Sequence, residues 1–369
     1  MRILGIETSC DETAAAVVEG GTKILSNVVA SSAEMHAKTG GIIPEQAARQ
    51  QVKSILPVLQ NALLKAESSK RNIEAIAVTV GPGLIGSLLV GVETAKTLAY
   101  IWKKPIIPVN HLVAHIYANF ISVNSKSQTL NSKQFKNSNL PEFPALALVV
   151  SGGHTDLVLM HNHGKLTWIG GTRDDAAGEA FDKSARLLGL SYPGGVSISK
   201  EAEKFNKSSI INHKSLNLFP RPLINEDNFD FSFSGLKTAV AREVKGKRLK
   251  VKDRQMLAAE IQEAIVDVLV DKTLKAVEKY QPKSLLLAGG VAANQRLRHK
   301  FELGIMNYES GVKLFIPDHK LCTDNAAVIA SCAYFNNHPV DWRKVDANPE
   351  LIITGFQTSY TNSPKGIKT

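Results

Sequence analysis

The chain repeats one pattern at two places that are more than a hundred residues apart. An apolar stretch at 2–8 leads into a small polar turn, and a second apolar stretch follows at 14–18. Residues 145–150 and 156–160 repeat this plan around the turn at 151–155. Short apolar runs bounded by turn residues are typical of buried strands. The repeat therefore predicts a duplicated α/β fold with two facing lobes, each presenting one turn to a shared cleft.

The size of the chain agrees with two lobes. At 369 residues it exceeds the length at which a single hydrophobic core usually stops growing. We expect an N-terminal lobe at 1–121, completed by a C-terminal helix at about 322–340, and a second lobe at 142–321. Residues 122–141 are rich in Asn, Ser, Lys and Gln, which predicts a flexible insertion or linker. The tail at 358–369 is expected to be disordered.

Alternating strands and helices are predicted between these landmarks. Apolar runs predict strands at 73–80, 106–110, 284–288 and 313–316, and alternating aromatic and polar residues predict one at 229–237. Helices are predicted at 46–66, at 253–280, from 81 to 102 after a glycine loop, and from 322 to 333. The 46–66 helix is amphipathic, because its apolar residues recur at helical spacing (Val52, Ile55, Leu56, Leu59 and Leu63).

The charge of the chain points to a polyanionic partner. Forty-four Lys and Arg residues against 34 Asp and Glu residues give a formal net charge of +10, for which RNA or DNA is the first candidate. The alternative is lysine accumulation on a solvated surface. The densest basic run, 245–252, is the candidate for a phosphate-backbone contact.

The sequence contains few features that indicate a cellular compartment or a membrane. Three cysteines give no disulfide framework, which suits a reducing cytoplasm. We expect neither a signal peptide nor a membrane span, because the first residues read as a strand and every long apolar run is interrupted by charge.

Two histidines form the first candidate site. His111 and His115 lie four residues apart directly after a predicted strand, so on a helix they share one face and can bind one divalent ion. Asp324 is the candidate third ligand. The alternatives are an ordinary histidine pair and, for Asp324, a helix cap.

Further polar residues stand at turns and helix starts. Asp11 and Glu12 lie in the first predicted hairpin turn, where they could handle a metal, a water or a proton, or could simply make the turn polar. Asp182 could bind a ribose hydroxyl. Asn294 could bind a ribose or a base, or cap the helix that follows it.

Eight blocks, taken together and in order, resemble the tRNA N6-adenosine threonylcarbamoyltransferase family (TsaD), once described as O-sialoglycoprotein endopeptidases. The blocks are 7–13, His111 with His115, 150–155, 174–183, 192–195, 231–237, 288–291 and 322–325. The resemblance implies a two-lobed actin/sugar-kinase/Hsp70-type fold with ribonuclease-H-like lobes. It also implies transfer of the threonylcarbamoyl group from threonylcarbamoyl-AMP to N6 of the adenosine 3′ of the anticodon, in tRNAs that read ANN codons.

The same resemblance implies roles for individual residues. The metal ligands would be His111, His115 and Asp324, holding one divalent ion, Fe²⁺ first and Zn²⁺ as the alternative. The substrate contacts would be Val149, Val150, Ser151, Gly152, Gly153, Asp182, Gly195 and Asn294. Accessory proteins of the TsaB and TsaE type are the implied partners beside tRNA. Asp11 and Glu12 are our candidates for accepting the proton of the attacking amine.

Two other functions compete with this one. A zinc metalloprotease of the glycoprotease type needs Glu directly after the first histidine, and this chain has Leu112 there. A non-catalytic nucleotide-binding scaffold of a tRNA-modification complex would be favoured by loss of the ligand set, which this sequence retains.

Overall fold

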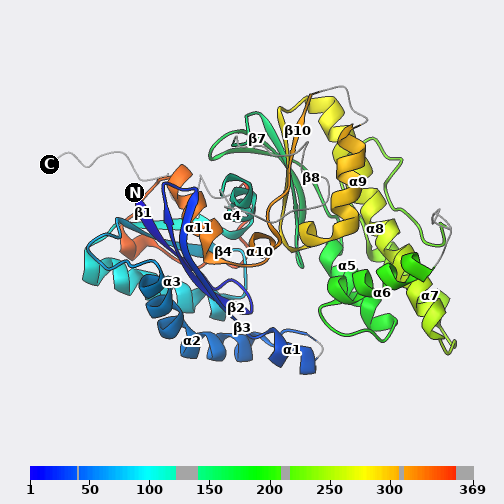
Figure 1. The fold of residues 1–369 in the computed structure, drawn as a ribbon, viewed down its shortest axis with the longest axis horizontal. Coiled ribbons are helices and arrows are strands. Elements are labelled where there is room, and N and C mark those ends of the chain that lie inside the picture. The colour runs from blue at the N-terminus through cyan, green and yellow to red at the C-terminus, as the bar shows by residue number, and fades with distance from the viewer. Residues whose placement is uncertain (40, 122–139, 209–216, 307–310, 355–369) are drawn as a thin grey trace.

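The computed structural model describes residues 1–39, 41–121, 140–208, 217–306 and 311–354. Within them the strands form two five-stranded sheets (Figure 1). The first sheet has the order β3-β2-β1-β4-β5 and consists of β1 (Arg2–Glu7), β2 (Glu12–Glu19), β3 (Lys23–Ser31), β4 (Ala75–Gly81) and β5 (Ile106–Asn110). The second has the order β10-β9-β6-β7-β8 and consists of β6 (Ala145–Val150), β7 (Thr155–Asn162), β8 (Lys165–Gly171), β9 (Ser284–Ala288) and β10 (Lys313–Phe315).

The two sheets share one topology. In the first, β1-β2 and β2-β3 are antiparallel while β1-β4 and β4-β5 are parallel. In the second, β6-β7 and β7-β8 are antiparallel while β6-β9 and β9-β10 are parallel. Three antiparallel strands followed by two parallel ones are the ribonuclease-H-like arrangement. Its duplication confirms the predicted two-lobed α/β fold of the actin/sugar-kinase/Hsp70 type.

Helices cover both faces of the first sheet, which explains why its central strands β1 and β4 are almost wholly buried. Leu4 and Ile6 belong to the core under α2 (Pro44–Lys65) and α3 (Ile85–Trp102). Ile3 belongs to the core under α11 (Ala326–Phe335). A Cβ on Gly5 would lie 2.4 Å from the main-chain oxygen of Ala326, so glycine permits the close approach of α11.

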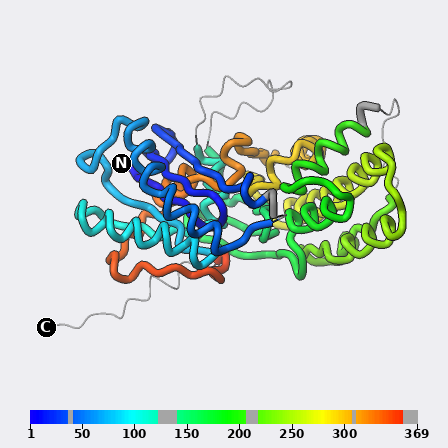
Figure 2. Tube along the Cα trace, turned by 90° about the horizontal axis from the view of Figure 1, so that it is seen from below, coloured from blue at the N-terminus to red at the C-terminus, as the bar shows by residue number. Residues whose placement is uncertain are grey.

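One hydrophobic core joins the two lobes. The short helices α4 (His111–Ile116) and η1 (Tyr117–Phe120) lie with α11 between the two sheets (Figure 1). Their apolar side chains pack in one cluster with Ala16 of the first sheet and Val149 of the second. Figure 2 shows the segments of the two lobes gathered at opposite ends of the molecule, with the α10–α11 region between them.

The outer face of the second sheet carries the remaining large helices. A separate core lies between Leu146, Leu148 and Val150 of β6 and the helices α5, α8 and α9. The remaining helices of the described residues are α1 (Ala33–Thr39), α5 (Ala177–Leu187), α6 (Gly194–Ser208), α7 (Ser234–Val244), α8 (Val251–Tyr280), η2 (Gly290–Ala293), α9 (Gln295–Met306), α10 (His319–Cys322) and η3 (Trp342–Lys344). In the described part of the chain, none of the helices is long and apolar enough to cross a bilayer.

The prediction of a strand at 229–237 was wrong. Within this stretch Phe231 alone forms a bridge, to Thr172, and α7 begins at Ser234. The carboxylate of Asp174 accepts hydrogen bonds from the main-chain N–H groups of Phe233 and Ser234, at 2.8 and 3.2 Å. These donors are satisfied without a neighbouring strand, so the alternating pattern reflects buried phenylalanines rather than a ladder.

Two other differences concern exposure. In α2, Ile55 and Leu59 are buried, but Val52 and Leu56 are 63% and 68% exposed, so helical spacing alone overstated the buried face. The third strand of each lobe was not predicted, because β3 lies at a sheet edge and has few fully buried positions.

The predicted insertion at 122–141 lies outside the described residues up to 139, and the predicted tail lies wholly outside them.

Candidate metal centre

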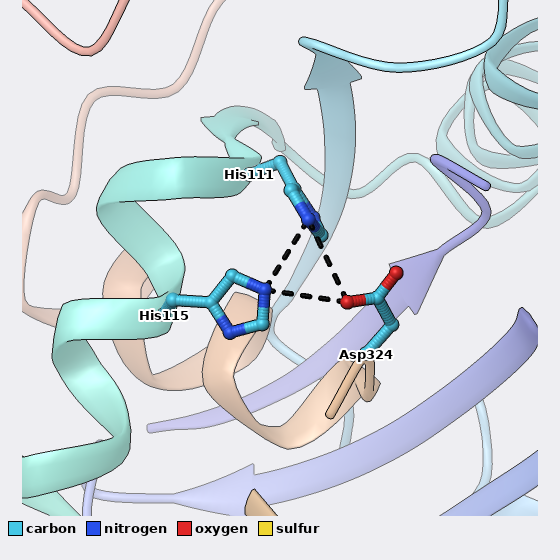
Figure 3. Close-up of side chains that lie close together, drawn as sticks. All are labelled: His111, His115 and Asp324. Atoms are coloured by element: carbon cyan, nitrogen blue, oxygen red, sulfur yellow. Dashed lines mark hydrogen bonds and ion pairs between the residues drawn. The ribbon is translucent and has the colours of Figure 1, made fainter. Parts of the chain in front are cut away.

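The histidine pair is positioned by a helix cap. Asn110 ends β5, and its side-chain oxygen accepts hydrogen bonds from the N–H groups of Leu112 and Val113. Its side-chain nitrogen donates to the main-chain oxygen of Ile352. The chain therefore turns directly from strand into helix, and His111 and His115 point to the same side of α4 (Figure 3).

Asp324 reaches the same point from the other end of the sequence. The cap of α11 is Asn325, whose side-chain oxygen accepts hydrogen bonds from the N–H groups of Ala327 and Val328. The alternative that Asp324 caps this helix was therefore wrong. Its carboxylate instead faces the histidines, with Oδ1 3.3 Å from Nε2 of His115 and 3.6 Å from Nε2 of His111 (Figure 3).

The three side chains fit a single divalent ion. The two histidine Nε2 atoms lie 3.2 Å apart, and all three donor atoms lie within 4.8 Å of one another. Metal–ligand bonds of about 2.1 Å place neighbouring ligand atoms about 3.0 to 3.4 Å apart in octahedral or tetrahedral geometry. Two imidazole nitrogens and one carboxylate oxygen suit iron or zinc, and three protein ligands leave a coordination position open.

The electrostatics of this cluster favour a cation. Burial disfavours a charged His111, but the carboxylates of Glu7 and Asp324 outweigh it and raise the pKa of His111 to about 9. Burial likewise disfavours an ionised Asp324, yet His111 and His115 lower its pKa to about 2. Two carboxylates thus hold positive charge at one buried place.

Glu7 is a residue that the sequence analysis missed. Its side chain is 1% exposed, and its Oε2 lies 3.1 Å from Nδ1 of His111. Oε2 also accepts a hydrogen bond from the hydroxyl of Thr79, and Oε1 accepts one from the N–H of Ser9, both at 2.5 Å. The available signal was an acidic residue ending a central apolar strand, because a buried carboxylate requires partners.

The predicted acids of the first hairpin turn adjoin the metal cluster. Burial raises the pKa of Glu12 to about 10, and the negative charge of Asp324 and a hydrogen bond to Asp11 add to the rise. Glu12 is therefore neutral at pH 7 in this arrangement. Asp11 is buried, and its main-chain oxygen accepts a 2.7 Å hydrogen bond from the hydroxyl of Ser32, which holds the turn against β3.

The turn of the second lobe lies within electrostatic range of the cluster. The N–H of Ser151 donates to the main-chain oxygen of His154 at 2.9 Å and closes the turn. Gly152 and Gly153 are exposed, and a Cβ on either would meet no atom within 4 Å. Burial and then the positive charges of the two cluster histidines lower the pKa of His154 to about 4, which agrees with a turn that faces them.

Val149 and Val150 end β6 with side chains that are at most 1% exposed. Their side chains therefore belong to the cores on the two faces of the sheet, and only their main chain remains to contact a ligand.

The remaining predicted substrate residues form one hydrogen-bonded network in the second lobe. The carboxylate of Asp182 accepts from the N–H of Gly194 at 2.6 Å. The hydroxyl of Ser199 donates to the main-chain oxygen of Gly195 at 2.8 Å, and Nδ2 of Asn294 donates to that hydroxyl at 3.0 Å. The structure therefore brings Asp182, Gly195 and Asn294 together.

Asn294 also has a structural role. Its Oδ1 accepts from the N–H of Leu297 at the start of α9, and its Nδ2 donates to Gln262 as well as to Ser199. Of its side-chain hydrogen-bonding capacity, one lone pair on Oδ1 remains. Both roles considered for this residue, cap and ligand contact, thus stay compatible with the structure.

Burial raises the pKa of Tyr192, and the negative charges of Asp11 and Asp182 raise it further. The basic run at 245–252 is exposed in the connection from α7 to α8, at the end of the second lobe away from α4 (Figure 1).

Comparison with known proteins gives the family. The model of the TsaD family, described as tRNA N6-adenosine threonylcarbamoyltransferase, matches residues 23–331. Relatives that carry this name are 48% identical in Dehalococcoides mccartyi, over 96% of this chain and 100% of the relative, and 48% identical in Bacillus subtilis, over 97% of each. The chain belongs to the TsaD family.

Solved structures resemble the chain more remotely. Component A of the (R)-2-hydroxyglutaryl-CoA dehydratase of Acidaminococcus fermentans superposes with a TM-score of 0.49 at 16% identity, over 90% of this chain and 98% of that one. YeaZ from Pseudomonas aeruginosa superposes with a TM-score of 0.29 at 15% identity, over 45% of this chain and 63% of that one.

Proposed function

We propose that this protein transfers the threonylcarbamoyl group from threonylcarbamoyl-AMP to N6 of the adenosine 3′ of the anticodon, in tRNAs that read ANN codons. Its family and the names of its full-length relatives support this activity. The single observation that carries the proposal in the structure is the convergence of His111, His115 and Asp324 beside the turns of both lobes. The excess of basic residues suits a tRNA substrate.

The three converging side chains would bind one divalent ion, Fe²⁺ in first place and Zn²⁺ as the alternative. Such an ion supplies Lewis-acid stabilisation of negative charge that develops on an oxygen of the acyl-adenylate. The donor set supports either metal, because both accept imidazole nitrogen and carboxylate oxygen. We name Fe²⁺ first because of the family resemblance.

The chain's own residues would bind the two halves of the donor substrate. The exposed turn at Gly152 and Gly153 allows the main chain to approach the phosphate and the carbonyl oxygen closely. Asp182, Gly195 and Asn294 would bind the adenosine half. The tRNA base must leave its stack to reach this place, which costs less in an anticodon loop than in a duplex.

The transfer step forms one bond and breaks one. The exocyclic nitrogen of adenosine attacks the carbonyl carbon, the C–N bond forms, the bond from carbon to the phosphate oxygen breaks, and AMP leaves. The nitrogen must also lose a proton. Asp11 and Glu12, which share a hydrogen bond in the first hairpin turn, are the candidate acceptors.

The rival functions have less support. A zincin-type protease would need an exposed general base beside the first histidine, and that position holds Leu112, which is 2% exposed. A non-catalytic scaffold would not require three donor atoms converging within 4.8 Å. Accessory proteins of the TsaB and TsaE type, and a place in the cytoplasm, belong to the same proposal and rest on family membership.

The experiment is nucleoside analysis of tRNA from cells depleted of this protein and complemented with variants. We expect N6-threonylcarbamoyladenosine to disappear on depletion, to return with the wild-type chain, and not to return with His111→Ala. The matched control is His161→Ala, because His161 is exposed on β7 and its ring forms a hydrogen bond with the nearby hydroxyl of Thr167, away from the metal cluster. Unchanged modification on depletion, in cells without a second copy, would contradict the proposal.

A further inference from the structure

His111 and His115 are held very differently on the side that faces away from Asp324. Nδ1 of His111 lies 3.1 Å from Oε2 of Glu7 and 3.2 Å from the hydroxyl of Ser9. Nδ1 of His115 is buried and has no hydrogen-bond partner among the described residues. At Nδ1, therefore, His111 has a charged partner and His115 has none among the described residues.

We propose that Glu7 is a positioning residue, which fixes the His111 tautomer that presents the Nε2 lone pair to a metal ion. The proposal rests on the metal centre of the proposed function. A neutral imidazole carries one proton, and an ionised carboxylate can only accept hydrogen bonds. Glu7 therefore keeps the proton on Nδ1 and leaves the lone pair on Nε2. The Ser9 hydroxyl cannot make this choice, because it can donate or accept.

The carboxylate of Glu7 is itself rigidly held. The hydroxyl of Thr79 donates to Oε2 and the N–H of Ser9 donates to Oε1, each at 2.5 Å. These contacts come from β4 and from the turn after β1, and the side chain is 1% exposed. With one oxygen bonded to main chain and the other shared between Thr79 and His111, the group cannot rotate without losing a partner.

Glutamine at this position tests the charge with almost no change of shape. If the amide oxygen faces His111 and Thr79, the amide NH₂ meets the N–H of Ser9, which is donor against donor. If the NH₂ faces His111, it needs a lone pair on Nδ1 and drives the proton to Nε2. Glu7→Gln must therefore either lose the Ser9 bond or favour the tautomer that cannot bind the metal.

The experiment measures metal binding without the transfer reaction. Zn²⁺ is titrated into chelator-treated protein in competition with a chromophoric chelator, for the wild type, Glu7→Gln, His111→Ala and Glu93→Gln. Outer partners of metal-binding histidines typically change metal affinity about 10- to 100-fold. We expect Glu7→Gln to weaken Zn²⁺ binding by about that factor, His111→Ala to weaken it more, and Glu93→Gln to match the wild type, because the Glu93 carboxylate is exposed and pairs with Lys96 on α3.

A second measurement does not depend on the variant folding. Nitrogen-15 NMR of the Zn²⁺-loaded wild-type protein reports which nitrogen of His111 carries the proton. We expect the proton on Nδ1. A proton on Nε2, or a Glu7→Gln variant that binds Zn²⁺ within twofold of the wild type, would overturn the role of Glu7. If His111→Ala bound Zn²⁺ as tightly as the wild type, the metal centre itself would be wrong, and Glu7 would lose its role with it.

Discussion

Single residues in the candidate metal centre combine burial with charge. Glu7 is 1% exposed and the side chain of Asp324 is 21% exposed. Burial acts to raise the pKa of both carboxyls, but the positive charge that they favour on His111 outweighs it, and both pKa values are lowered. Buried charges are costly unless they are paired or bind a metal. The arrangement is therefore better explained by a ligand than by stability.

The first prediction concerns how the folding stability of chelator-treated protein changes with pH. The pKa of His111 is about 9 in the fold and 6.5 in an unfolded chain, so the folded state binds more protons than the unfolded state between these values. Stability from this group is present in full below pH 6.5 and is lost as the pH rises through 9. The loss is about 3 kcal/mol.

Thermal unfolding from pH 6 to 9.5 checks this prediction. Glu12, with its pKa raised to about 10, also makes stability fall as the pH rises. The informative quantity is therefore the difference between the slopes of stability against pH in the wild type and in His111→Gln. We expect the wild type to lose more stability than the variant across this range. Equal slopes would show that His111 is not held protonated by its neighbours.

The sequence could predict the residue types of this site but not all of its members. Spacing put His111 and His115 on one face, and family resemblance supplied Asp324, which the structure places against them. Glu7 stood inside the first motif without a role, because its partners Thr79 and His111 are 72 and 104 residues away. Contacts of that range depend on strand order, which local patterns do not contain.

Two capped helices deliver the candidate ligands at the level of secondary structure. Asn110 begins α4 and Asn325 begins α11, and in each case the ligand stands directly beside the cap. Capping fixes the first turn of a helix and so fixes the direction of the residue next to it. The position of Asp324 thus depends on a hydrogen-bonding neighbour that never touches the metal site.

The second prediction tests this dependence with Asn325→Ala. The variant loses the bonds to Ala327 and Val328, which we expect to cost about 1 to 2 kcal/mol of stability, and it lets Asp324 move. Thermal unfolding and Zn²⁺ affinity should both fall. The control is Asp341→Ala, which removes the cap of η3 and should leave Zn²⁺ binding unchanged. Full Zn²⁺ affinity in Asn325→Ala would contradict the coupling.

Strands with two covered faces were the easiest elements to predict. Residues 106–110, 145–150 and 284–288 are apolar apart from the terminal Asn110 and Ser284, and they match β5, β6 and β9 to the residue. The start of α7 could not be predicted in this way, since its N–H groups donate hydrogen bonds to the carboxylate of Asp174, which is 60 residues away from Ser234 in sequence.

The whole molecule depends on one core that both lobes share. Phe120 is 1% exposed in η1, and its ring lies 5.5 Å from that of Phe335 in α11 and 5.2 Å from that of His163 in the β7–β8 turn. Such contacts join the first lobe to the second through apolar packing rather than through a polar surface. We infer that the two lobes are stabilised together.

The third prediction compares two buried phenylalanines. Phe120→Ala should cost about 3 to 5 kcal/mol and raise amide hydrogen exchange in β1 and in β6, because its core reaches both sheets. Phe301→Ala is the matched control. Phe301 is equally buried but belongs to the outer core of the second lobe, so exchange should rise in β6 and not in β1. If amide hydrogen exchange rose in only one lobe of Phe120→Ala, the lobes would unfold independently.

The most direct test of the account is anomalous X-ray diffraction from crystals of protein that is active in threonylcarbamoyl transfer. Data collected on both sides of the iron and zinc absorption edges locate the ion and identify it. We predict one anomalous peak, bounded by Nε2 of His111, Nε2 of His115 and the carboxylate of Asp324, and its loss together with activity in His111→Ala. Fully active crystals with no anomalous peak between these three side chains would contradict the account.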